Sequence, residues 1–116
     1  MSKAADQEVF DTAARHLLRQ QEHCTNLLGQ FVLRAGGRAC SIGCLIPRER
    51  FRAEMNDWFR ERLQHHFADL PLGQCSLALL EDLQAVHDNW APFAWREKLA
   101  LVARQHGLDT SALEPA

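Results

Sequence analysis

The stretch Cys40-Ser41-Ile42-Gly43-Cys44-Leu45-Ile46-Pro47 marks the point at which the chain is expected to change from strand to helix. Gly43 can end or kink a strand, and Pro47 suits the first turn of a helix, where its missing N–H costs nothing. The same apolar run holds two thiols, Cys40 and Cys44. The elements on either side are therefore predicted outward from this boundary.

Upstream of the boundary, the sequence predicts a helix followed by a β-hairpin. Apolar residues recur at helical spacing from about residue 5 to residue 22, with charged residues on the other side. Residues 31–34 are typical of a short strand. The flexible pair Gly36-Gly37 favours a tight turn that returns residues 39–42 alongside that strand.

Downstream, residues 48–70 carry apolar side chains at spacings of three and four. This pattern predicts one long helix or two shorter ones, and we favour a break near Asn56-Asp57. Ser76 is expected to be the N-cap of a further helix that ends near residues 87–89. Pro92 is expected to open the last helix, and Gly107 to occupy its C-terminal cap.

Together these signals predict a mainly α (α+β) fold, with a helix, a small β-hairpin and then three to four helices packed as one compact domain. A chain of 116 residues that is 47% hydrophobic and 24% charged can form one core but not two. The domain is expected to span residues 1–116, with an ordered core of roughly residues 5–108.

The composition also bounds location and partners. No stretch approaches the roughly 20 apolar residues of a membrane span, and residues 1–8 lack the apolar core of a secretory signal. A cytoplasmic protein without a membrane partner is expected. The formal net charge is -2, and the arginines of residues 48–62 alternate with carboxylates, so nucleic acid is not an expected partner.

Metal binding is considered because the chain has six histidines and four cysteines, namely Cys24, Cys40, Cys44 and Cys75. Structural zinc sites usually pair Cys-x2-Cys with a second close pair, whereas three residues separate Cys40 from Cys44. In a strand, that spacing places the two thiols roughly 13 Å apart unless Gly43 bends the chain. We expect no metal, no cofactor, and reduced cysteines that act as small core residues.

A catalytic role for a nucleophilic thiol is the more specific alternative to a structural role for the cysteines. Cys44 precedes the expected helix start, and the positive end of a helix lowers a thiol pKa. His87-Asp88-Asn89 offers a base and its orienting groups, although adjacent residues at a helix end cannot all point the same way. No catalytic residue is assigned in the leading interpretation. The alternative is a small thiol-dependent enzyme or redox protein that uses Cys44 with His87 and Asp88.

Three large rings, Trp90, Phe93 and Trp95, fall within six residues across a turn. A small core is expected to leave at least one of them exposed, and tryptophan is enriched at interface hot spots. These three residues are therefore predicted to form a partner-binding surface. The edge of the hairpin is a second candidate surface, because free strand edges invite pairing.

The segments Gln7-Glu8-Val9-Phe10-Asp11-Thr12-Ala13, residues 40–47 and Leu83-Gln84-Ala85-Val86-His87-Asp88-Asn89 resemble those of small uncharacterised bacteriophage and prophage proteins. Those proteins share a Gly-Cys-Leu-Ile-Pro run and a later His-Asp-Asn. The likeness covers most of the chain and is weakest from about residue 52 to 75. The chain departs from it at Ala35-Gly36-Gly37, which replaces a longer turn, and at Arg48, where an acidic residue is usual.

The resemblance implies a context rather than an activity. Mobile-element proteins of this size are often accessory factors that bind and inhibit a host protein or a defence system, and a fold alone does not identify the target. The leading hypothesis is a non-enzymatic, cytoplasmic protein-binding module of phage or prophage origin, acting as an accessory factor or inhibitor of a host or defence protein. Its partner would be another protein, or a second copy of the chain in a homodimer.

Overall fold

The N-terminal helix, α1 (Lys3–Gln20), forms the long edge of the computed structural model, which describes residues 2–115. Ser2 caps the helix, because its Oγ accepts a hydrogen bond from the amide of Ala5 at 3.2 Å. Gln21 ends the helix in the left-handed conformation, with φ 55°. The buried face of α1 comprises Ala5, Val9, Phe10, Ala13, Ala14 and Leu17. The helix predicted at residues 5–22 is confirmed, with both ends two residues earlier.

The predicted β-hairpin is also confirmed, but its strands are shorter than expected. β1 (Arg34–Ala35) pairs antiparallel with β2 (Arg38–Ala39). Gly36-Gly37 forms the turn with φ values of 58° and 79°, which suit glycine at both central positions of a tight hairpin. Further upstream, the expected strand is reduced to an isolated bridge between Thr25 and Phe31.

Cys40 to Pro47 forms a turn and a short 3-10 helix, η1 (Gly43–Leu45), so the expected strand over residues 39–42 extends no further than Ala39. The amide of Cys44 donates to the carbonyl of Cys40 at 3.1 Å, as in a helical turn. Gly43 is required there, because a Cβ at this position would overlap the carbonyl oxygen of Leu33. Gly43 therefore permits a close crossing of two backbone segments.

The prediction of an α-helix that starts at Pro47 is wrong. Pro47 is followed by a single 3-10 turn, η2 (Arg48–Arg50), and the backbone is extended again at Phe51. A third 3-10 helix, η3 (Ala53–Asp57), precedes α2 (Arg60–His66). The break favoured near Asn56-Asp57 is thus confirmed.

The C-terminal half follows its local sequence signals. A short helix, α3 (Pro71–Gln74), leads into α4 (Leu77–Asn89). Ser76 caps α4 as predicted, because its Oγ accepts from the amide of Leu79 at 3.3 Å.

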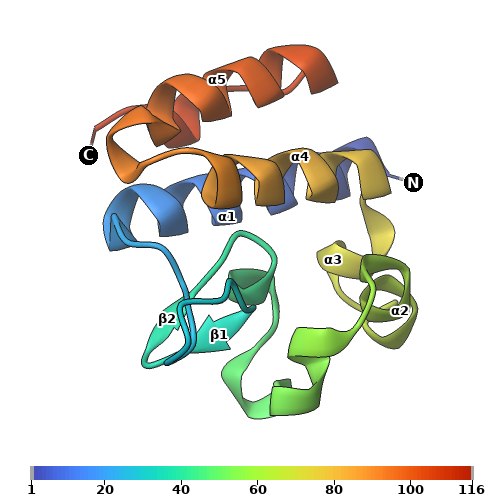
Figure 1. Ribbon diagram of the computed structural model, residues 1–116. Coiled ribbons are helices and arrows are strands. Elements are labelled where there is room, and N and C mark those ends of the chain that lie inside the picture. Colours follow the sequence, from blue (N-terminus) through green and yellow to red (C-terminus); the bar gives the residue numbers. More distant parts are fainter. Residues whose placement is uncertain (1, 116) are drawn as a thin grey trace.

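The last helix begins slightly later than predicted. Pro92 opens a 3-10 turn, η4 (Pro92–Ala94), which leads directly into α5 (Trp95–His106). Gly107 ends α5 with φ 63°, which confirms the predicted C-terminal cap. A final 3-10 turn, η5 (Ser111–Leu113), lies on the segment that runs back along α5 (Figure 1).

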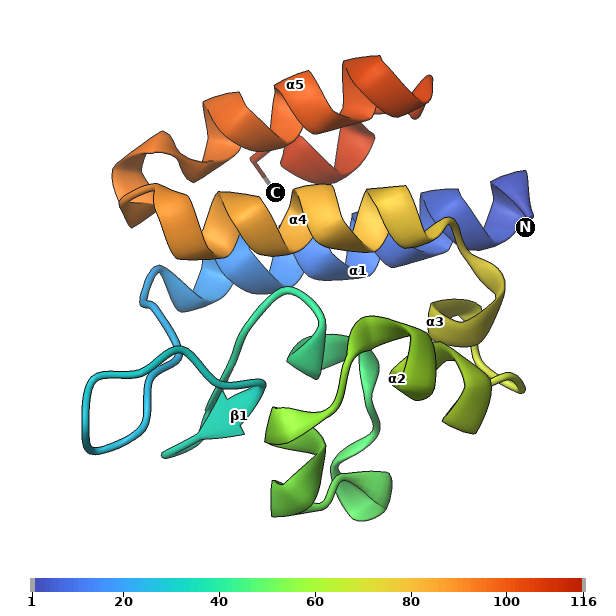
Figure 2. The same cartoon turned by 45° about the vertical axis from the view of Figure 1, so that its right-hand side comes forward.

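The three long helices form one side of the molecule, and the hairpin and short helices form the other. In Figures 1 and 2, α4 lies between α5 and the region that contains the hairpin, α2 and α3, with α1 packed behind α4. Residues from both regions form one buried cluster that includes Phe10, Ile42, Phe67 and Trp95. The mainly helical fold with a small hairpin is confirmed; Met1 and Ala116 of the predicted domain lie outside the described residues.

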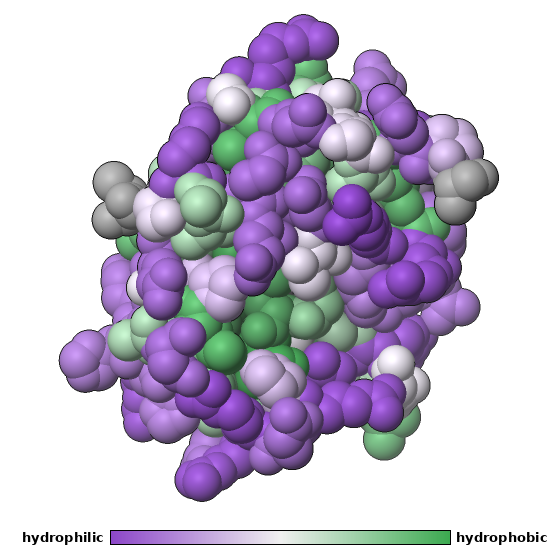
Figure 3. Space-filling model, turned by 180° about the vertical axis from the view of Figure 1, so that it is seen from behind, coloured by the Kyte–Doolittle hydropathy of each residue, from purple (hydrophilic) through white to green (hydrophobic). Residues whose placement is uncertain are grey.

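Among residues 2–115, no helix combines the length and the apolar character that a membrane crossing needs. Seen from behind, the molecule is largely covered by hydrophilic residues, and hydrophobic side chains reach the surface in a few separate areas (Figure 3).

Candidate functional site

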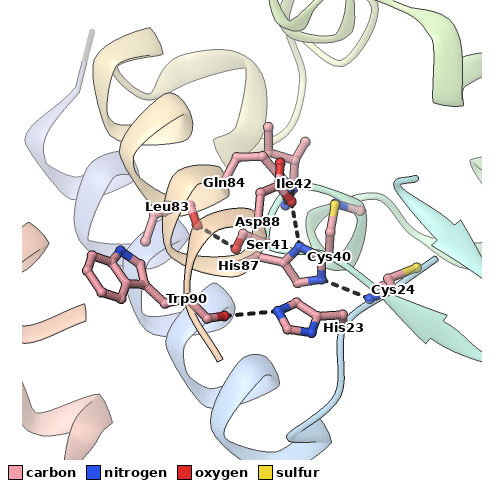
Figure 4. A network of polar contacts seen from close by, with 12 residues as sticks. His23, Cys24, Cys40, Ser41, Ile42, Leu83, Gln84, His87, Asp88 and Trp90 are labelled. Atoms are coloured by element: carbon pink, nitrogen blue, oxygen red, sulfur yellow. Dashed lines mark hydrogen bonds and ion pairs between the residues drawn. The ribbon is translucent and has the colours of Figure 1, made fainter. Parts of the chain in front are cut away.

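The segment that follows β2 is joined to α4 by a buried network of polar contacts (Figure 4). Ser41 Oγ donates to the carbonyl of Leu83 at 2.7 Å, and the amide of Ile42 donates to Gln84 Oε1 at 3.3 Å. Ser41 is fully buried and Gln84 is nearly so. Buried polar groups are costly when unpaired, so these bonds fix the position of the turn against α4.

His87 lies at the centre of this network and is fully buried. Its Nε2 accepts a hydrogen bond from the backbone amide of Cys24 at 2.9 Å. A backbone amide can only donate, so the neutral ring carries its proton on Nδ1, which lies 2.7 Å from Asp88 Oδ1 and donates to it. Gln84 Nε2 donates to the same carboxylate oxygen at 2.9 Å. Both ring nitrogens of His87 therefore have partners within the fold.

Aromatic rings surround His87 and connect it to the turn between α4 and α5. Its ring lies 5.3 Å from that of His23, 5.5 Å from Phe31 and 5.7 Å from Trp95, measured between centroids. His23 Nε2 and Trp95 Nε1 both donate to the carbonyl oxygen of Trp90, at 2.9 and 3.0 Å. The loop after α1 and the α4–α5 turn are thus held together.

The thiol-dependent alternative requires the Cys44 thiol to lie beside the His87 ring. The two side chains instead make separate sets of contacts. The Cys44 thiol donates to the carbonyl of Ser41 at 3.1 Å. It lines a small pocket of about 100 Å³ beside Thr12 of α1 and Leu72 of α3. Of the three alternative catalytic residues, Cys44, His87 and Asp88, only the last two contact each other.

The environment of the thiols also opposes nucleophilic chemistry. Burial raises the pKa of the Cys44 thiol, and it raises the pKa of Cys40 and of Cys75 to about 11. Burial raises the pKa of Cys24 as well. A thiolate is the reactive form, so these groups are poor nucleophiles at neutral pH. Cys24, Cys40 and Cys75 are buried and free, which confirms the interpretation of cysteines as small core residues.

The histidines considered as metal ligands have other surroundings. Within residues 2–115, no group of three or more His, Cys, Asp or Glu side chains is placed to hold one metal ion. His66 instead packs between the rings of Trp58 and Phe67, with centroid distances of 5.2 and 4.8 Å.

The predicted aromatic surface divides into two exposed rings and one buried ring. Phe93 is 90% exposed and Trp90 is 46% exposed, whereas Trp95 is fully buried. The assignment of Trp95 to a partner-binding surface is therefore corrected. Its ring stacks against His87 at an interplanar angle of 28°, and its indole N–H is satisfied by the Trp90 carbonyl, so Trp95 belongs to the core.

The sequence interpretation missed two exposed leucines in the loop after α1. Leu27 and Leu28 are strongly exposed at the tip of a loop that Asn26 holds closed. Asn26 Oδ1 accepts from the amides of Leu28 and Gln30 at 2.9 and 3.0 Å. The Asn26–Gly29 spacing could have indicated this turn, because asparagine side chains commonly bond the backbone two residues on and glycine accepts a positive φ.

The loop after α1 and the α4–α5 turn both carry exposed large apolar side chains, which we call the apolar rim. The rim comprises Leu27, Leu28, Phe31, Trp90 and Phe93. His23 links the two segments, since it packs against Phe31 at 5.5 Å and bonds to the Trp90 carbonyl. In Figures 1 and 2 both segments lie on the same side of the molecule.

The edge of the hairpin is a weaker candidate surface. Its strands contain two residues each, so they offer few free backbone groups for an added strand. Arg34 and Arg38 are also engaged within the fold, with the carbonyl of Ile46 and the carboxylate of Glu22. The apolar rim is the better-formed surface.

No family model, no curated protein and no solved structure matches this chain.

Proposed function

We propose that this protein is a non-enzymatic protein-binding module that acts in the cytoplasm of a bacterial host cell. In this proposal it is a phage- or prophage-borne accessory factor that inhibits a host or defence protein by binding it. The single observation that supports binding is the apolar rim, in which large side chains are exposed on two distant segments that His23 links. Contiguous exposed apolar side chains are typical of protein interaction sites.

The rigidity of the rim strengthens the proposal. The loop that carries Leu27 and Leu28 is closed by hydrogen bonds to Asn26, and the turn that carries Phe93 is fixed through the Trp90 carbonyl. A surface that is ordered before binding loses less conformational entropy when a partner docks. The rim is therefore suited to act as a preformed binding surface.

Trp90 has the features of an interface anchor. The Nζ of Lys98 lies 3.8 Å from the centroid of its ring, so one face is covered by a cation. The side chain nevertheless remains 46% exposed. Tryptophan residues in this half-buried state are often the hot spots of protein interfaces.

The thiol-enzyme alternative finds no support in the positions of its residues. The Cys44 thiol and the His87 ring make separate sets of contacts, and both nitrogens of His87 are engaged. The phage or prophage context comes from the resemblance in sequence. It suggests a bacterial protein as the partner, with a second copy of this chain as the other partner to be tested.

The proposal is tested by an affinity pull-down from a bacterial host lysate. Wild-type protein is compared with Phe93→Ser and Leu28→Ser, which change exposed side chains and are expected to leave the fold intact. Phe59→Ser is the matched control, because Phe59 is 82% exposed but precedes α2 and lies outside the rim. We expect a specific partner to be retained by wild type and by Phe59→Ser and lost by both rim variants.

Sedimentation velocity of the purified proteins distinguishes the homodimer. If the rim pairs two copies of the chain, wild type sediments as a dimer and Phe93→Ser as a monomer. Retention of the same partners and the same oligomeric state by both folded rim variants would remove the rim from the proposal.

A further inference from the structure

A groove runs between α5 and the returning C-terminal segment, and none of the residues of the apolar rim lines it. Its volume is about 650 Å³, and its floor is formed by the apolar side chains of Ala100, Leu108 and Leu113. Leu108 and Leu113 are almost completely buried, so they present a thin apolar strip rather than whole side chains. Such a floor can receive the apolar side chain of a ligand.

A second hollow, of about 550 Å³, continues this groove onto α1. It is lined by Arg15, Leu18 and Arg19 of α1, and it shares Arg96, Glu114 and Pro115 with the first hollow. The shared lining residues make the two hollows one extended surface. In chain order, this surface combines α1, α5 and the segment that contains η5.

The border of this surface has an excess of positive charge. Four exposed arginines, Arg15, Arg19, Arg96 and Arg104, line the two hollows with only two carboxylates, Glu97 and Glu114. The whole chain has the opposite balance, with a formal net charge of -2. This surface is thus positively charged although the whole chain has a negative net charge.

These arginines have no acidic partner within the described chain. No ion pair among residues 2–115 involves any of the four. Arg15 and Arg19 are also four residues apart on one helix, where like charges are neighbours and repel each other. An anionic ligand would relieve this repulsion and occupy the unused guanidinium donors.

The chemistry of the lining favours an acidic peptide over a nucleic acid. None of the residues that line the two hollows is aromatic, so there is no platform on which bases could stack. Glu97 and Glu114 would repel a continuous phosphate backbone, whereas a peptide can place its carboxylates at the arginines alone. The apolar side chains of a peptide could also pack on the apolar floor of the groove.

We propose that this groove binds an acidic segment of a partner protein. One or more apolar side chains of that segment pack on Ala100, Leu108 and Leu113, and its carboxylates pair with the four arginines. This site is separate from the apolar rim and does not depend on the function proposed for it.

The test uses a random library of peptides of about twelve residues, selected on the full chain and then measured singly by fluorescence anisotropy. We expect enriched peptides to contain several Asp or Glu residues and at least one large apolar residue. Arg96→Glu, which changes the residue shared by both hollows, should weaken the binding of such a peptide by about tenfold or more. Higher salt should weaken it as well.

Three controls make the result specific. Arg48→Glu reverses another exposed arginine, which lies outside the groove, and should bind as wild type does. Phe93→Ser should also bind as wild type, which separates this site from the rim. Circular dichroism checks that each variant is folded; if Arg96→Glu fails to fold, Arg104→Glu replaces it.

The proposal is overturned by an absence of enrichment, by enrichment of neutral or basic peptides, or by binding that Arg96→Glu leaves unchanged. It is also overturned if single-stranded thymidine oligonucleotide displaces the selected peptide and binds more tightly. Loss of peptide binding in Phe93→Ser with retention in Arg96→Glu would assign the selected peptides to the rim.

Discussion

Cys24 and His87 are 63 residues apart in the chain and are joined by a hydrogen bond of 2.9 Å from the backbone amide of Cys24 to Nε2 of His87. The bond connects the loop after α1 to the C-terminal end of α4, and it leaves Nδ1 to donate to Asp88. His87 therefore acts as an internal connector between the two segments that carry the apolar rim.

Replacement of His87 by alanine is expected to lower the free energy of unfolding by about 2–4 kcal/mol, because it removes a buried ring and leaves the Cys24 amide unpaired. Urea denaturation followed by circular dichroism measures the change. His65→Ala is the control, since His65 is exposed and its loss should cost less than about 0.5 kcal/mol. Equal stability of the two variants would contradict the connecting role of His87.

The four thiols are expected to be unreactive in the folded protein. Burial raises the pKa of all four, so little thiolate is present at neutral pH. Labelling with iodoacetamide near pH 7, read by mass spectrometry, should therefore be slow until denaturant is added. Rapid labelling of Cys44 in the folded protein would revive the thiol-dependent alternative.

The same pKa shifts predict that stability falls at alkaline pH. The thiols of Cys40 and Cys75 have a pKa of about 11 in the folded protein against 9.0 as the ordinary value. Between these values the unfolded chain loses its thiol protons first, so the unfolded state is favoured as pH rises through this range. Urea denaturation from pH 8 to 11 should show this decline. It should be shallower in Cys75→Ala; an unchanged slope would argue against the shift at Cys75.

Gly43→Ala is expected to destabilise the fold by about 2–4 kcal/mol, because the added methyl group would overlap the Leu33 carbonyl. Gly29→Ala is the matched control. Gly29 has a positive φ of 79° but no atom within 4 Å of an added Cβ, so only the backbone cost of about 1–2 kcal/mol applies. Thermal denaturation of both variants provides the comparison. A smaller loss of stability for Gly43→Ala than for Gly29→Ala would show that the backbone at Leu33 can move away from residue 43 at little cost in free energy.

Asn26→Ala is expected to loosen the loop that carries Leu27 and Leu28 without unfolding the protein. The substitution removes the three side-chain hydrogen bonds that Asn26 makes within the loop, and the loop is already exposed. Limited proteolysis should therefore cleave within residues 25–31 faster than in wild type, while the free energy of unfolding changes by less than about 1 kcal/mol. Two backbone hydrogen bonds, from the amide of Asn26 to the Gln30 carbonyl and from the amide of Gly29 to the Asn26 carbonyl, would remain. Unchanged cleavage would mean that these backbone bonds alone hold the loop.

The elements that could be predicted from the sequence are those specified by local signals. The apolar periodicity of α1, the Ser76 cap of α4 and the Gly107 cap of α5 act within one or two turns of helix, so neighbouring residues suffice to identify them. The Gly36-Gly37 turn is of the same kind.

The region around Pro47 could not be predicted because distant contacts determine it. The carbonyl of Leu33 lies against Gly43, and the amide of Leu33 donates to Asn56 Oδ1 at 2.9 Å. These contacts hold the chain in short turns where the proline suggested a longer helix. The burial of a side chain is also determined by contacts with distant residues. The sequence therefore did not predict that Trp95 is buried in the core or that Leu27 is exposed.

The carbonyl oxygen of Trp90, which accepts from both His23 and Trp95, links the outer rings to the interior. Removing the Trp95 indole would free one side of this acceptor and let the Phe93 turn shift, although Trp95 itself never reaches the surface. An alanine scan scored only by loss of binding would therefore count interior residues as contact residues. Mapping of the interface should use substitutions that keep the indole N–H in place.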